Sequence, residues 1–173
     1  MKMNICLASE STAQLKIMKI LGIDPGYDRL GIAVIEKPSK GKETVLYSAC
    51  FSTSKRETIY WRLNEIGKEV VRVMDKFKPD AIALETLFIT KNQKTAMRVA
   101  EARGIILYEG IKRDLRISEY SPMEIKMAIT GDGTSDKSRI IKMVHLLVKM
   151  PIKKLDDEYD AIAVALTCSA RVK

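Results

Sequence analysis

Four acidic side chains are the residues of this sequence best suited to catalysis. Asp24 and Glu85 each end a short apolar run that is typical of a buried strand. If those strands are parallel neighbours, both carboxylates lie at the edge of the sheet where open α/β folds bind ligands. Asp157 and Asp160 are three residues apart in a predicted helix, so they share one face of it. We expect this face to reach the same edge and bring four carboxylates together.

Such a cluster predicts a site for hard cations. Carboxylates held close together repel one another unless a cation lies between them, and Mg²⁺ prefers carboxylate and water oxygens. Two ions about 4 Å apart can activate a water and stabilise the leaving oxygen in phosphodiester cleavage. The chain has a net charge of +8, which favours a polyanionic partner such as nucleic acid. Acids within a basic protein therefore indicate a metal-dependent nuclease.

Each acid taken alone has a simpler interpretation. An Asp before Pro-Gly is usually a turn residue, and an acid after an apolar run is often only the end of a strand. Acids in the first turn of a helix commonly interact with the helix dipole. The nuclease hypothesis therefore depends on the four acids acting together.

The apolar patterns predict an α/β fold with one mixed sheet and helices on both faces. The order is βββαβαβ followed by helices, which is a meander leading into a βαβ crossover. Strands are predicted at 18–23, 30–35, 44–51, 81–84 and 115–120. Helices are predicted at 57–77, at 90–113, from Pro122, at 135–149 with Ser135 as its N-cap, and at 156–171.

Length and composition indicate one cytoplasmic domain. The chain has 173 residues, within the usual range of roughly 100–200 for a domain, and no apolar run long enough to span a membrane. We expect the domain to cover 18–173, with 1–17 either a disordered extension or a segment before the true start codon. The cysteines are Cys6, Cys50 and Cys168, and this scattered set favours neither a disulfide framework nor a zinc site.

Several sequence blocks extend this pattern along the chain. They are LGIDPGYDRLGIAVI at 21–35, ALETLF at 83–88, KN at 91–92, ARG at 102–104, Lys126, TGDGTSDKS at 130–138 and DEYDAIAVA at 157–165. In this order and spacing they resemble the RuvC family of Holliday junction resolvases, from Met18 to the last residue. The resemblance implies an RNase H-like fold. It also implies that Asp24, Glu85, Asp157 and Asp160 bind two Mg²⁺, or Mn²⁺, and direct a water at the scissile phosphate.

The resemblance further implies DNA contacts. Lys126 and Lys137 match two family lysines near the site, and Phe88 matches an aromatic that stacks on a base near the junction centre. Lys91 is grouped with them as a DNA-binding residue. The simpler interpretations are core packing for Phe88 and solvated surface charges for the lysines.

The family works as a homodimer, with RuvA and RuvB branch-migration proteins as its partners. The helix at 90–113 contains Ala100, Ala102 and Gly104, so it is our candidate interface. The alternative is that these small residues pack on the chain's own sheet. Three departures from the family pattern are notable. Tyr27 and Asp28 place an aromatic residue and an extra acid in the first turn, and Thr86 follows the Glu where Gln is familiar. Asp156 lies beside Asp157 as a second candidate for the third ligand, and the spacing to Asp160 favours Asp157.

Three other features receive structural interpretations. His145 has no partner at metal-ligand spacing and is expected to be structural. Tyr60 and Trp61 are expected to pack within their helix, with base stacking as the less favoured alternative. The Gly-rich loop at 130–134 lacks the GxxxxGK[ST] pattern of a nucleotide-binding loop.

The resemblance thus implies a crossover junction endodeoxyribonuclease of DNA recombination and repair, which leaves a 3′-hydroxyl and a 5′-phosphate. One alternative is a phage-like endonuclease that cuts flaps and other branches. Another is an actin-like phosphate-binding protein, because GIDPGYDRLG also resembles the first phosphate loop of that class. A catalytically inactive junction-binding module would be favoured by loss of an acid, and all four acids are present.

Overall fold

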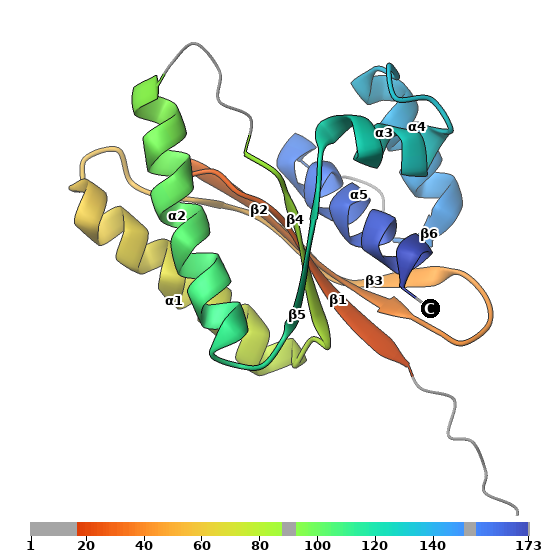
Figure 1. The fold of residues 1–173 in the computed structure, drawn as a ribbon, viewed down its shortest axis with the longest axis horizontal. Coiled ribbons are helices and arrows are strands. Elements are labelled where there is room, and N and C mark those ends of the chain that lie inside the picture. The colour runs from red at the N-terminus through yellow and green to blue at the C-terminus, as the bar shows by residue number, and fades with distance from the viewer. Residues whose placement is uncertain (1–16, 88–92, 151–154, 173) are drawn as a thin grey trace, which may run out of the picture.

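The computed structural model describes residues 17–87, 93–150 and 155–172. A six-stranded mixed sheet forms the middle layer, and helices cover both of its faces (Figure 1). The strands are β1 Met18–Asp24, β2 Arg29–Lys37, β3 Glu43–Ser52, β4 Ala81–Glu85, β5 Arg116–Tyr120 and β6 Val148–Lys149. The helices are α1 Ile59–Phe77, α2 Gln93–Ile111, α3 Pro122–Thr130, α4 Lys137–Leu147 and α5 Asp156–Arg171.

The strand order is β5-β4-β1-β2-β3-β6. Strands β1, β2 and β3 form the predicted antiparallel meander, and β1, β4 and β5 run parallel. The register pairs Ile23 of β1 with Leu84 of β4. The next residue on each strand, Asp24 or Glu85, therefore ends its strand at the same edge of the sheet. The predicted mixed sheet with helices on both faces is confirmed.

Two hydrophobic cores lie on opposite faces of the sheet. Ile20 of β1 and Ala83 of β4 belong to the core under α3, α4 and α5, whereas Leu21 and Leu84 belong to the core under α1 and α2. Because side chains alternate between faces along a strand, Asp24 and Glu85 continue the rows that face α5.

Helix α5 lies very close to the strands because two glycines leave room for it. A Cβ atom added to Gly22 of β1 would overlap the carbonyl oxygen of Ala161 and would lie 2.7 Å from the Cβ of Ala165. A Cβ added to Gly31 of β2 would overlap the carbonyl oxygen of Asp157. The close approach brings the first turns of α5 to the sheet edge that carries Asp24.

Two local predictions were wrong in the segment after α3. The helix predicted through 149 ends at Leu147, because Val148 and Lys149 pair with the start of β3 as a sixth strand. Burial of the β-branched Val148 side chain favours this extended end. The N-cap of α4 is Asp136, whose Oδ1 accepts from the Arg139 amide at 2.8 Å. Ser135 instead shares a 2.7 Å hydrogen bond with the hydroxyl of Thr130.

Among the helices that the structure describes, none has the length and apolar character needed to cross a membrane. Cys50 and Cys168 are free thiols, and Cys6 lies outside the described residues.

Candidate active site

The carboxyl group of Asp24 lies at the centre of a cluster of acids. Its pKa is raised to about 7, first by burial and then by the negative charges of Glu85, Asp160 and Asp157. Burial also raises the pKa of Glu85, and Asp160 adds to that effect. Every acid singled out from the sequence is thus close enough to influence Asp24. The fold brings Asp24 close to Asp157 and Asp160, which follow it in the sequence by 133 and 136 positions.

The carboxylate of Asp157 is paired with a basic side chain of the protein. The Arg29 guanidinium, at the start of β2, forms an ion pair with its carboxylate. The thiol of Cys50 donates to the same oxygen at 3.3 Å, and Arg29 Nε lies 3.4 Å from that sulfur. Sequence analysis did not single out Arg29 or Cys50. The signal for Arg29 was its place five residues after Asp24, on the strand paired with β1.

The carboxylate of Asp160 is paired with a second basic side chain. The Lys137 ammonium, from the first residue of α4, lies 2.9 Å from Asp160 Oδ2 and 3.5 Å from Asp156 Oδ2. Lys126 of α3 lines a small cavity together with Glu85 and Asp160. The positive charges of Lys126 and Lys137 both oppose the rise in the pKa of Glu85. The two predicted lysines therefore lie beside the acids.

The donor chemistry of this cluster fits a divalent cation. Four carboxylates provide only hard oxygen ligands, and the raised pKa of Asp24 reflects burial first and, after it, repulsion by the other acids, which a cation would relieve. As they stand, the described side chains include no group of three acids, cysteines or histidines arranged around a metal position. Arg29 and Lys137 each hold one of the four carboxylates in an ion pair.

A buried network anchors the turn that follows Asp24. Arg62 of α1 forms an ion pair with Asp28, donates to the carbonyl oxygen of Tyr27 at 3.2 Å and stacks its guanidinium 4.5 Å from the Tyr27 ring centroid. Arg62 Nε also donates to Thr53 Oγ1 at 2.8 Å, and that hydroxyl donates to the Tyr27 carbonyl oxygen at 2.7 Å. This network fixes the backbone immediately beyond the first acid.

A further arginine anchors the end of β4. Arg103 of α2 donates to the backbone carbonyl oxygen of Glu85 at 3.1 Å and forms an ion pair with Glu119 of β5. Its side chain is only 11% exposed. Arg103 belonged to the ARG block noted in the sequence, where its contact with the backbone of an acid was not foreseen.

Other predicted residues have mixed outcomes. Phe88 and Lys91 lie outside the described residues. His145 Nε2 forms a 2.7 Å hydrogen bond with the Tyr159 hydroxyl, in agreement with a structural role. The prediction that Tyr60 and Trp61 pack within their helix was wrong, because Arg62 and Ile66 occupy the buried face of α1 and leave both rings exposed.

The small residues of α2 face different surroundings. Ala102 is buried in the core, which favours packing on the chain's own fold at this position. Ala100 is exposed, and a Cβ added to Gly104 would meet nothing within 4 Å. The interface hypothesis therefore rests on Ala100 and Gly104 and stays a prediction.

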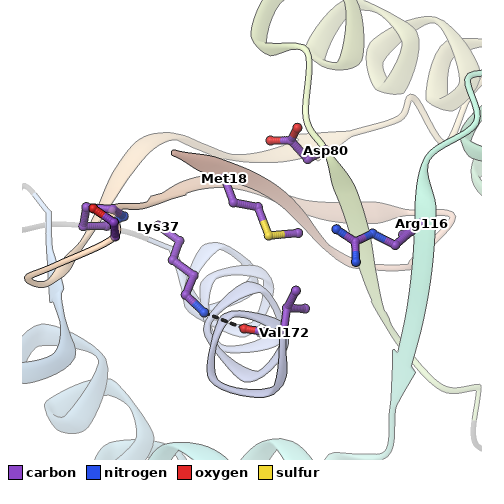
Figure 2. Close-up of a pocket in the computed structure, with 7 residues that line it drawn as sticks. Met18, Lys37, Asp80, Arg116 and Val172 are labelled. Atoms are coloured by element: carbon purple, nitrogen blue, oxygen red, sulfur yellow. Dashed lines mark hydrogen bonds between the residues drawn. The ribbon is translucent and has the colours of Figure 1, made fainter. Parts of the chain in front are cut away.

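Figure 2 shows a pocket at the opposite end of the sheet, beside the start of β1. Lys37 Nζ donates to the carbonyl oxygens of Ser169 and Val172, at 2.7 Å each. Asp80 accepts from the Lys19 amide at 2.8 Å. Because these groups hold the end of α5 and the start of β1, their role is to maintain the fold.

A mixed sheet in this strand order, with acids from two parallel strands and a crossing helix at one edge, defines an RNase H-like nuclease. The chain belongs to the RuvC family, since the model of crossover junction endodeoxyribonuclease RuvC matches residues 20–168. Its relatives of that name include the Thermosipho melanesiensis protein, 46% identical over 86% of this chain and 94% of the relative. The Finegoldia magna protein is 39% identical over 86% of this chain and 91% of that relative.

Solved structures agree with this assignment. Thermus thermophilus RuvC in complex with Holliday junction substrate superposes with a TM-score of 0.81 at 31% identity, over 87% of this chain and 92% of that one. The yeast mitochondrial Holliday junction resolvase Ydc2 gives a TM-score of 0.61 at 12% identity, over 91% of this chain and 82% of that one. This likeness concerns the fold alone.

Proposed function

We propose that this protein resolves Holliday junctions by paired symmetric nicks, with Asp24, Glu85, Asp157 and Asp160 as its catalytic carboxylates. The observation that carries the proposal is the convergence of these acids at one sheet edge in a member of the RuvC family. The similarity to a Thermus relative in complex with Holliday junction substrate supports the same substrate for this chain.

The four carboxylates would hold two Mg²⁺, with Mn²⁺ as a substitute. When bound, such ions lower the pKa of a water and stabilise the leaving oxygen. Asp24 would have to be ionised to act as a ligand, so its raised pKa opposes metal binding at acidic pH. Lys126 and Lys137 would contact phosphate oxygens, because they are the cations beside Glu85 and Asp160. Phe88 and Lys91 remain proposed DNA contacts on the strength of the sequence.

Paired nicks require two active sites related by a two-fold axis, because the strands to be cut are related in that way. We therefore infer a homodimer, with the exposed side of α2 as the candidate interface. RuvA and RuvB are the proposed partners in the cytoplasm, and this proposal rests on the family alone.

The test compares a labelled four-way junction, a flap and a linear duplex, each incubated with Mg²⁺ or with EDTA. We expect symmetric nicks in the junction only, abolished by EDTA and by Asp24→Asn. Equal cutting of the flap would show a relaxed branch nuclease. Tight junction binding without cleavage in Mg²⁺ or Mn²⁺ would contradict the enzymatic proposal.

A further inference from the structure

The N-terminal end of α1 exposes two adjacent aromatic side chains. The Tyr60 side chain is 79% exposed and that of Trp61 is 60% exposed. Large aromatic rings are usually buried, because burial removes a large apolar area from water. Here the buried face of α1 runs through Arg62, Ile66 and Val70, so both rings are presented to solvent.

The turn before α1 adds positive charge beside these rings. Lys55 and Arg56 are both exposed, and the turn is held by a 3.2 Å hydrogen bond from the Glu57 amide to the Ser54 carbonyl oxygen. Glu57 is the single acid in this segment, 54–62. Exposed aromatic rings flanked by cations are the combination that proteins use to bind unpaired nucleic acid strands.

This end of α1 is directly linked to the backbone that follows Asp24. Arg62, the next residue after Trp61, binds Asp28 and the carbonyl oxygen of Tyr27. The Thr53 amide donates to the Asp28 carbonyl oxygen at 3.1 Å, which ties the end of β3 to the same turn. Figure 1 shows the N-terminal ends of α1, α2 and α5 toward the end of the sheet where β1 and β4 finish. The N-terminal ends of α1 and α5 therefore lie toward the same end of the sheet, on opposite faces of it.

We propose that Tyr60 and Trp61 form a stacking platform for unpaired bases of a branched DNA strand that leads away from the cut. Lys55 and Arg56 would contact the phosphates of that strand. The inference rests on the proposed function, and it adds a binding site to that function. Stacking tolerates any base, which suits an enzyme that must first recognise the shape of a branch.

Trp61 provides a direct test, because it is the only tryptophan of the chain. A labelled four-way junction with unpaired bases at its centre, introduced as mismatches, is titrated in EDTA, and binding is followed by the anisotropy of the DNA label. Tryptophan emission and its quenching by iodide are measured in the same samples. We expect emission to fall and iodide access to decrease in parallel with binding.

The outcomes separate the two proposals. Junction binding with unchanged emission and unchanged iodide access would overturn the platform and leave the proposed function intact. Absence of junction binding would remove the proposed function and the platform with it. Protection of Trp61 that rises with protein concentration without DNA would mean that a second copy covers the rings, and it would also overturn the platform.

Variants provide an independent check. Trp61→Ala and Tyr60→Ala should each weaken junction binding by about five- to a hundredfold, the range expected for loss of one base–aromatic stack. Trp61→Phe should retain most of the affinity, because it keeps an aromatic face. Leu146→Ala is the matched control, since this exposed side chain lies at the far end of α4. Equal affinity of Trp61→Ala and Leu146→Ala would contradict the proposal.

The basic residues are tested by the salt dependence of binding. The double variant Lys55→Ala with Arg56→Ala should lower the slope of log affinity against log salt by about two, one for each lost phosphate contact. An unchanged slope would exclude these side chains from the DNA interface.

Discussion

Burial, and after it the negative charges of the neighbouring acids, destabilise the ionised carboxyl group of Asp24. Its pKa is about 7 in the folded protein, against 3.8 as its ordinary value. The folded state therefore binds a proton more tightly than the unfolded state, and stability falls as pH rises from about 4 to about 7. This loss of stability is complete above about pH 7 and absent below about pH 4.

Asp24→Asn should remove the destabilisation that ionised Asp24 causes. In EDTA above pH 7 we expect the variant to be more stable than the wild type, by at most about 4 kcal/mol at ~1.4 kcal/mol per pKa unit. The advantage should shrink as pH falls toward 4. Urea unfolding at several pH values measures it, and added Mg²⁺ should stabilise the wild type more than the variant. Equal stability at every pH would contradict the electrostatic account.

Arg29 competes with any cation for Asp157, since the carboxylate cannot serve both fully. Arg29→Ala should therefore raise the affinity of the metal-free protein for Mn²⁺, by about two- to fivefold given the exposure of the ion pair. Titration followed by electron paramagnetic resonance measures free Mn²⁺ directly. Arg139→Ala is the matched control, because Arg139 is equally exposed but pairs with Asp132. Weaker Mn²⁺ binding by Arg29→Ala would mean that Arg29 positions Asp157 for the metal.

At the residue scale the sequence was informative about the acids and uninformative about their partners. Asp24 and Glu85 could be found because each ends an apolar strand, a local pattern. Arg29 and Arg62 could not be found, because their roles depend on which elements meet in space. Exposure of Trp61 was missed for a related reason: the buried position beside it belongs to a charged residue, Arg62, which apolar periodicity does not reveal.

Among the elements, α5 depends most on close packing. Gly22→Ala should destabilise the protein by roughly 1–3 kcal/mol, the usual range for overpacking, because its Cβ would overlap the backbone of α5. Lys68→Ala is the control, since this side chain is exposed on α1 and alanine favours a helix. Denaturant unfolding compares them. A neutral Gly22→Ala would show that α5 can shift without loss, and activity would then report whether Asp157 and Asp160 remain in place.

The packing of α2 against the ends of β4 and β5 depends on Arg103. Arg103→Ala should cost about 1–3 kcal/mol, because it leaves the carbonyl oxygen of Glu85 and the carboxylate of Glu119 without this donor. Arg98→Ala, which removes an exposed ion pair with Glu101 on the same helix, should cost less than about 0.5 kcal/mol. Thermal unfolding measures both. Similar losses would mean that Arg103 does not fix the end of β4.

At the element scale the strong patterns were predictable and the short ones were not. The meander, the crossover and the long helices follow from apolar periodicity over many residues. Strand β6 has two residues, and its pairing with Glu43 and Thr44 arises from distant sequence. Ser135 and Asp136 are both good N-cap residues, so composition alone could not choose between them.

For the whole molecule, charge determines how the protein meets DNA. The net charge of +8 coexists with a cluster of acids at one edge, so basic side chains elsewhere must provide the attraction. We expect junction affinity to fall at least about tenfold between roughly 50 and 200 mM salt, because bound phosphates release counterions. Fluorescence anisotropy in EDTA measures this. Affinity that is independent of salt would argue against phosphate contacts as the main source of binding.

The dispersal of the acids over β1, β4 and α5 has a consequence for protein synthesis. Helix α5 follows every other described element in the chain, and it carries two of the four carboxylates. A growing polypeptide that has formed its sheet therefore still lacks half of the proposed cation ligands. Nuclease activity would begin only when α5 docks against Gly22 and Gly31.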